Sequence, residues 1–133
     1  MILTGLKGEQ HDIDALQVLF ARPTARGTGE QGKTWIVWST LTKVKEAIAV
    51  VGPGLEGENT VLKRFMLPNK TSIWINVKDA VGPIYMPPGF RVHGNKCWIG
   101  IGKSQFGLGN TQQEVADIIR SGGGKPEPII EDD

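Results

Sequence analysis

The stretch that decides the fold reads Thr71-Ser-Ile-Trp-Ile-Asn-Val-Lys-Asp-Ala-Val-Gly-Pro-Ile-Tyr85. From Ile73 to Val77, aliphatic residues alternate with polar or aromatic ones, and a period of two is typical of a strand with one buried face. Pro83 ends the pattern because it has no amide hydrogen to donate to a sheet. The stretch therefore predicts a strand that ends before Pro83.

The composition is that of an ordinary globular domain. The chain has 133 residues, 39% hydrophobic and 22% charged, and this length allows one domain or two half-domains that share a core. No apolar run reaches the ~20 residues of a membrane helix, so we expect no membrane partner and a cytoplasmic location. The single cysteine, Cys97, excludes an internal disulfide and a cysteine-based zinc site within one chain. We expect no cofactor and no metal site.

The charge is unevenly distributed along the chain. The net charge is +1, but residues 125–133 contain one lysine and four carboxylates, so this tail carries −3 and residues 1–124 carry +4. We expect the tail to be disordered. A mildly basic body is compatible with an anionic partner, although +4 is ordinary for a body of this size.

The first half predicts strands followed by one helix. Ile2–Leu6 and Lys33–Thr40 predict strands, the latter because β-branched and aromatic residues dominate it. Residues 42–51 predict a helix, because apolar residues recur there every three or four positions (Val44, Ala47, Ile48 and Val51). Gly52-Pro53-Gly54 should end this helix, and residues 55–59 should form a linker.

The second half predicts a hairpin, a further strand and a second helix. Thr60–Leu67 and Ser72–Val77 are the expected strands of the hairpin, and Lys96–Ile101 is the further strand. Thr111-Gln-Gln-Glu114 matches a capping box, which marks the start of a helix. The expected buried face of this helix comprises Val115, Ile118 and Ile119.

Several segments of the first half recur in the second. Asp14-Ala-Leu recurs as Asp79-Ala-Val, and Lys33-Thr-Trp-Ile recurs as Lys96-Cys-Trp-Ile, in each case before a predicted helix. We predict an α+β fold with a mostly antiparallel sheet of about six strands and two amphipathic helices. Residues 1–124 would form one compact domain, and a duplication would divide it into β-β-β-α units at 1–54 and 59–124. Chance agreement among common apolar residues explains the recurrence equally well.

Residues 60–121 resemble a known family. The features that match are the run Ile73-Trp-Ile-Asn-Val-Lys-Asp-Ala-Val, a later strand with a small loop, and the helix Gln113-Glu-Val-Ala-Asp-Ile-Ile. In these residue types the segment is similar to the small FlbD-like flagellar regulatory proteins of bacteria. The resemblance covers about half of the chain, and the long connection from Tyr85 to Gly94 departs from it. It implies a small non-enzymatic regulator or interaction module.

Gly27-Thr-Gly-Glu-Gln-Gly-Lys-Thr34 matches the phosphate-binding loop pattern G-x-x-x-x-G-K-[S/T]. In that pattern the backbone amides between Gly27 and Gly32 would bind phosphates, Lys33 would reach the terminal phosphates, and Thr34 would ligate magnesium. The pattern requires a helix after the loop, whereas the next residues, 35–38, favour a strand. A glycine-rich connection between two strands explains the loop as well as a nucleotide site does.

The four tryptophans all fall on predicted strands (Trp35, Trp38, Trp74 and Trp98). If exposed, Trp74 and Trp98 beside Lys78 and Lys96 would form a stacking platform for single-stranded nucleic acid. The alternative is that the tryptophans fill a second core layer between sheet and helices. Burial is the favoured interpretation, because aromatic side chains on strands are usually buried.

Two further groups could carry chemistry. Acidic residues and a histidine cluster between Glu9 and Asp14 and could ligate a metal, although such runs are more often solvated turns. His93 and Cys97 could form a base and a nucleophile, but Cys97 lies in an apolar strand, where a buried thiol is inert.

We therefore expect a small non-enzymatic binding or protein-interaction module that associates with itself or with a protein partner. Two alternatives stay open: single-stranded nucleic-acid binding through the strand tryptophans and lysines, and nucleotide binding through the loop from Gly27 to Thr34.

Overall fold

The computed structural model describes residues 1–25 and 27–132. Within these residues the α+β class and the antiparallel pairing are confirmed, but there are ten strands, not about six. In chain order the strands and α-helices are β1 (Ile2–Thr4), β2 (Gln10–Asp12), β3 (Phe20–Pro23), β4 (Thr34–Val37), β5 (Leu41–Val44), α1 (Ile48–Glu58), β6 (Leu62–Met66), β7 (Ser72–Asn76), β8 (Ala80–Ile84), β9 (Cys97–Ile101), β10 (Ser104–Leu108) and α2 (Gln112–Ser121). Two 3-10 turns, η1 (Ala15–Gln17) and η2 (Pro88–Phe90), complete the set.

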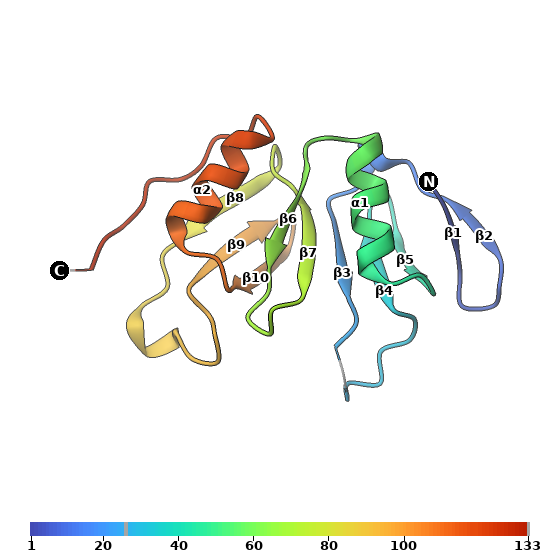
Figure 1. Cartoon of the computed structure of the whole chain (residues 1–133), viewed down its shortest axis with the longest axis horizontal. Helices are drawn as coiled ribbons and strands as arrows, with labels where there is room; N and C mark the ends of the chain where they lie inside the picture. Colours follow the sequence, from blue (N-terminus) through green and yellow to red (C-terminus); the bar gives the residue numbers. More distant parts are fainter. Residues whose placement is uncertain (26, 133) are drawn as a thin grey trace.

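The two halves of the chain have the same order of elements. Each begins with a hairpin (β1–β2 or β6–β7), continues with a three-stranded meander (β3–β4–β5 or β8–β9–β10) and ends with a helix. The halves lie side by side along the long axis, with the termini at opposite ends (Figure 1). They join where β3 pairs with β7, which produces one five-stranded sheet in the order β5-β4-β3-β7-β6.

The equivalence of the halves extends to single hydrogen bonds. The amide of Lys45, just after β5, donates to the carbonyl of Thr4 in β1 at 2.8 Å. The amide of Gly109, just after β10, donates to the carbonyl of Met66 in β6 at the same distance, 2.8 Å. Each bond ties the end of a meander to the first strand of its own hairpin, so Thr4 and Met66 hold equivalent positions. The fold therefore consists of two similar units, each with a hairpin added to the expected β-β-β-α pattern.

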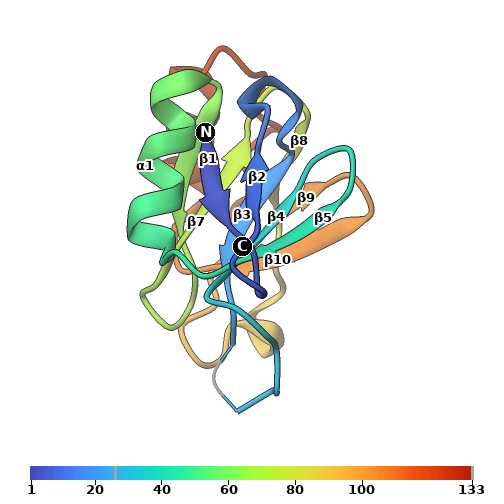
Figure 2. The same ribbon diagram turned by 90° about the vertical axis from the view of Figure 1, so that its right-hand side faces the viewer.

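Two hydrophobic cores lie on opposite sides of the shared sheet. Alternate residues of the joining strands point to different cores: Ala21 and Trp74 to the first, Phe20 and Ile73 to the second. In Figure 2, which looks onto the end formed by the first unit, α1 and the β1–β2 hairpin lie in front of the shared sheet. The β8–β9–β10 meander and α2 contribute to the second core. Each core is therefore built mostly from one unit and is completed by residues of the other, Leu62 and Trp74 in the first core and Phe20 in the second.

The expected helix at residues 42–51 is wrong. Residues 41–44 form β5, and α1 begins at Ile48 and runs through Gly52-Pro53-Gly54 to Glu58. The glycines fit the helix because a Cβ on Gly52 would overlap the ring of Trp74, and one on Gly54 would overlap the Met1 side chain. Small residues there allow the helix to approach the sheet closely, and this packing outweighs their poor helix propensity. The expected linker at 55–59 is thus mostly the last turn of α1, and the first unit ends at Glu58.

The two helices are equivalent, but the residues that correspond between them are not the ones expected from the sequence. The buried residues of α1 are Val51, Gly52 and Leu55, and those of α2 are Val115, Ala116 and Ile119. Val44 instead lies in β5 opposite Thr34, as Leu108 lies in β10 opposite Cys97. The predicted capping box of α2 is confirmed. The predicted hairpin at 60–77 and the strand at 96–101 are also confirmed, as β6–β7 and β9.

Candidate functional site

The loop that matches the phosphate-binding pattern connects two antiparallel strands, β3 and β4. Gly27, Gly29 and Gly32 have positive φ angles, as expected for glycines in tight turns. No helix follows the loop, so no helix N-terminus points its amides at the place where phosphates would bind. The glycines therefore serve the turn, and the sequence match lacks the backbone context that a nucleotide site requires.

The two side chains that would act on a nucleotide do not converge. Lys33 is exposed, but Thr34 is fully buried in the shared sheet. The Thr34 hydroxyl donates to the carbonyl of Glu46 at 2.7 Å, and its burial keeps a metal ion from reaching its oxygen. The loop is instead held by Arg22, which donates twice to the Glu30 carboxylate at 3.0 and 2.7 Å. These bonds, with one from the amide of Ala25, lower the pKa of Glu30 to about 2.

The four residues proposed for nucleic-acid binding do not form one stacking platform. Trp74 is 4% exposed, belongs to the first core and donates to the Glu56 carboxylate at 2.9 Å. Trp98 lies half-buried on the outer face of the second meander, beside Phe90. The two lysines are exposed, Lys78 in the turn between β7 and β8 and Lys96 directly before β9, two residues from Trp98. Trp74 therefore fills a core, which was the favoured interpretation.

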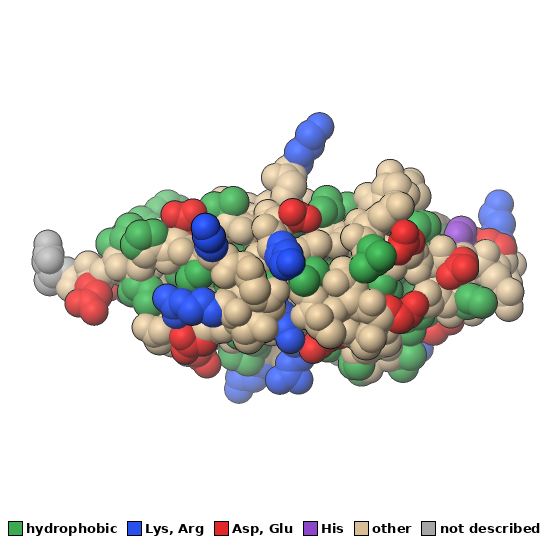
Figure 3. Space-filling view, turned by 90° about the horizontal axis from the view of Figure 1, so that it is seen from above, with side chains coloured by type: hydrophobic (Ala, Val, Ile, Leu, Met, Phe, Trp, Pro, Cys, Tyr) green, Lys and Arg blue, Asp and Glu red, His purple; other side chains and the backbone are tan. Residues whose placement is uncertain are grey.

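Trp35 is the tryptophan with the most basic surroundings. The guanidinium carbon of Arg22 lies 4.4 Å, and the amine of Lys43 4.5 Å, from the ring centre. Both residues are cross-strand neighbours of Trp35 on the same sheet face. These cations occupy the positions that a stacked base would need. On the face drawn in Figure 3, basic and acidic side chains are interspersed and do not form a continuous basic surface.

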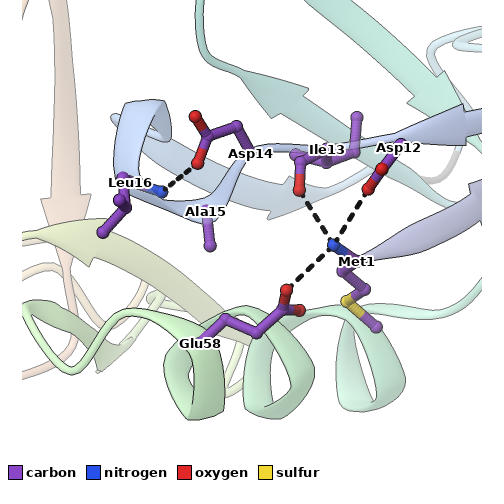
Figure 4. Close-up of a pocket in the computed structure, with 7 residues that line it drawn as sticks. All are labelled: Met1, Asp12, Ile13, Asp14, Ala15, Leu16 and Glu58. Carbon is purple, nitrogen blue, oxygen red and sulfur yellow. Dashed lines mark hydrogen bonds and ion pairs between the residues drawn. The ribbon is translucent and has the colours of Figure 1, made fainter.

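The acidic residues and the histidine between Glu9 and Asp14 have different partners and do not form one site. His11 contacts Glu9 at 3.1 Å, and the Asp14 carboxylate accepts the amide of Leu16 as the cap of η1. The terminal amine of Met1 binds the Ile13 carbonyl and the carboxylates of Asp12 and Glu58 in a hollow of about 480 Å³ (Figure 4). Among the described residues, no group of three or more His, Cys, Asp or Glu side chains is arranged to hold a metal ion.

Cys97 and His93 do not form a catalytic pair. Cys97 is fully buried in the second core, and its thiol donates to the carbonyl of Asn110 at 3.3 Å. Burial, with a smaller effect from the Glu114 carboxylate, raises the pKa of Cys97 to about 11, so the reactive thiolate is scarce at neutral pH. His93 is exposed in the loop before β9.

The structure of the C-terminal tail differs from the one expected from the sequence. Residues 125–132, expected to be disordered, lie extended along β8 and the start of α2, whereas Asp133 lies outside the described residues. The amide of Glu127 donates to the carbonyl of Gly82 in β8 at 2.7 Å. Further on, the Gln112 side chain pairs with both backbone groups of Ile130: its amide donates to the carbonyl at 2.9 Å, and its oxygen accepts the amide hydrogen at 3.1 Å.

A charged clamp holds the tail beyond Ile130. Arg91 donates to both oxygens of the Asp132 carboxylate, at 2.7 and 3.1 Å, and the Tyr85 hydroxyl donates to the same carboxylate. The bonds from Arg91 and then Tyr85 lower the pKa of Asp132, so the carboxylate stays ionised below its usual range. Arg91 and Tyr85 come from the connection between β8 and β9, which the tail therefore ties to α2.

We call the channel that holds these residues the tail groove. Space remains on both sides of the bound tail, and the two hollows measure about 420 and 610 Å³. One wall of the groove is apolar (Val81, Pro83, Ile84 and Tyr85), and the other is polar and basic (Arg91, Lys96, Thr111, Gln112 and Gln113). Sequence reasoning missed these residues, although a basic body with an acidic tail was a signal that the two could meet.

No family model, no curated protein and no solved structure matches this chain. Across the described residues, neither helix is both long enough and apolar enough to cross a membrane.

Proposed function

We propose that this chain is a non-enzymatic protein-interaction module that binds an extended acidic peptide in the tail groove. The observation that supports this function is that the groove already holds a peptide of that kind, the chain's own residues 125–132. The FlbD-like resemblance, which implies a non-enzymatic regulator, agrees with this proposal.

The contacts define what the groove would select. Gln112 and the Gly82 carbonyl bind backbone groups, so they favour an extended chain of any sequence. The apolar wall favours proline and aliphatic side chains such as those of Pro128 and Ile130. Arg91 binds a carboxylate through two parallel hydrogen bonds, which is the strong and geometrically specific mode for this pair. The preferred ligand is an aliphatic residue followed two positions later by a carboxylate.

The nucleotide and nucleic-acid alternatives have less support. The hydroxyl of Thr34 is buried and already bonded, and Trp74 is buried in the first core. The tail groove, in contrast, offers exposed polar groups and open space beside an extended backbone.

Binding of a fluorescent peptide with the sequence of residues 125–132 tests the proposal. In the full chain, Asp132→Ala should loosen the tethered tail, so this variant should bind the peptide more tightly than the natural chain does. Adding Arg91→Ala should weaken binding by about tenfold or more, since a charged hydrogen bond contributes ~1.5–3 kcal/mol. Arg120→Ala is the matched control, because among the described residues the Arg120 side chain pairs with the exposed Asp117 on α2, away from the groove. Equal binding to the Arg91→Ala variant would contradict the proposal.

A further inference from the structure

At the junction between the two units, one surface of the first unit contacts one surface of the second. Each unit also has the equivalent of the other unit's contact surface, and these two equivalents are not in contact with each other. Thr4 pairs with Gln10 in the first hairpin as Met66 pairs with Ser72 in the second. Because Thr4 and Met66 are equivalent, each hairpin residue of the first unit corresponds to the residue 62 positions later. This correspondence shows which surface of the first unit matches the surface that the second unit uses at the junction.

At the junction, a groove of the second unit receives the end of β3. The groove measures about 320 Å³, and its second-unit wall includes Asn69, Thr71, Ile73 and Phe106. Its other wall is the segment from Arg22 to Ala25. Beside it, the rings of Phe20 and Phe106 meet edge to face, with centres 4.9 Å apart. These contacts bury the outer face of the first meander against the second unit.

The first unit has the equivalent groove, and it is open. Four residues that line it are equivalent to the four of the second unit: Lys7, Glu9, His11 and Thr42 correspond to Asn69, Thr71, Ile73 and Phe106. The groove measures about 480 Å³ and is also lined by apolar side chains (Leu6, Trp38 and Leu41). Leu41 is 46% exposed. We call this surface the acceptor groove.

The second unit has the surface that would enter such a groove. Ile84 in β8 stands opposite Trp98, as Arg22 in β3 stands opposite Trp35, so the end of β8 is equivalent to the end of β3. This outer face is uncovered and apolar even with the tail in place: Val81 is 53% and Phe90 61% exposed. We call Val81, Ile84 and Phe90 the donor face.

We propose that a second copy of this chain docks head to tail, with its donor face in the acceptor groove of the first. Both surfaces are apolar. The acceptor groove is lined by two lysines, Lys7 and Lys43, and by one carboxylate, Glu9, which leaves an excess of positive charge. Glu127 and Glu131 lie in the tail beside the donor face. Docking occurs through side-chain faces, because Pro83 has no amide hydrogen and the tail already occupies the Gly82 carbonyl.

The two docking surfaces differ, so the contact is heterologous. Every open assembly therefore keeps one free acceptor groove at one end and one free donor face at the other. Association should therefore continue beyond a dimer as the concentration rises. Val81 and Ile84 belong both to the donor face and to the apolar wall of the tail groove, whereas the acceptor groove lies on the other unit, so Leu41 tests this inference apart from peptide binding.

Sedimentation of the full-length chain over a concentration series tests the inference. The average mass should rise beyond twice the 14.5 kDa of one chain. Leu41→Asp in the acceptor groove and Val81→Asp on the donor face should each keep the chain monomeric. An equal mixture of these two variants retains one intact surface of each kind and should form dimers that grow no further.

Val50→Asp is the matched control, because Val50 is 56% exposed on α1 and lines neither surface. This variant should associate as the natural chain does, and circular dichroism should show that all three variants are folded. A natural chain that stays monomeric, a mixture that does not dimerise, or a Val50→Asp variant that stays monomeric would each overturn the inference. Leu41→Asp should leave peptide binding to the tail groove unchanged. The peptide assay and the sedimentation assay therefore test the two proposals separately.

Discussion

Replacement of Gly52 by alanine tests the packing of α1 on the shared sheet. The new methyl group would lie less than 3.0 Å from three atoms of the Trp74 ring, which cannot move freely because it is buried and bonded to Glu56. Overpacking of this kind costs ~1–3 kcal/mol, and a rigid neighbour places the cost near the upper end. Alanine recovers about 1 kcal/mol of helix propensity. The net expectation is a loss of about 2 kcal/mol.

Thermal unfolding followed by circular dichroism measures this loss, which corresponds to a fall of roughly 8 °C in Tm for a chain of this length. In a Trp74→Phe background the same substitution should cost less, since the smaller ring leaves room for the methyl group. Gly57→Ala is the matched control, because no atom lies within 4 Å of a Cβ there. It should raise stability by up to ~1 kcal/mol. A neutral or stabilising Gly52→Ala would refute the close approach of α1 to Trp74.

Three further predictions concern the cores and the loop. Leu55→Ala and Ile119→Ala should each cost ~2–5 kcal/mol, and unfolding measured by denaturant titration should stay a single transition because the cores share one sheet. The Cys97 thiol should react with a thiol reagent only as fast as the chain unfolds, because it is buried and its pKa is raised to about 11. The folded pKa of Glu30, about 2, lies below the usual 4.5, so its ionised form stabilises the fold and the stabilisation is lost as pH falls through this range. The Tm of the natural chain should therefore fall more steeply between pH 4.5 and 2 than that of Glu30→Gln.

Local chemistry in the sequence predicted the second unit well. The alternation around Ile73 specified β7, and the hydroxyl of Thr111 with the carboxylate of Glu114 specified the start of α2. These signals depend on neighbours in the chain, so a sequence contains all of the information needed to interpret them. The recurrence of Lys-x-Trp-Ile also located β4 and β9 correctly as equivalent strands.

The errors arose where distant parts of the chain decide the structure. Gly52-Pro53-Gly54 has the composition of a helix stop, but Trp74, distant in sequence, makes small residues favourable there. Similarly, the charges of residues 125–132 are typical of a disordered tail until Arg91 and Gln112 are placed beside them. Pairing partners this far apart leave no local pattern, so apart from the opposite charges of body and tail the sequence held no sign of the tail groove.

The seam between β3 and β7 makes the chain a candidate split protein. The connection between α1 and β6 is short and lies outside both cores, so a cut at residues 59–61 would remove no buried side chain of the shared sheet. Each fragment would then carry one unpaired edge strand and most of one core. The first core would lack Leu62 and Trp74, and the second would lack Phe20. Each piece alone would leave part of its core and the joining edge of β3 or β7 exposed, and reassociation of the two pieces would cover both. Fused to two other proteins, the fragments would report their proximity by regaining structure together.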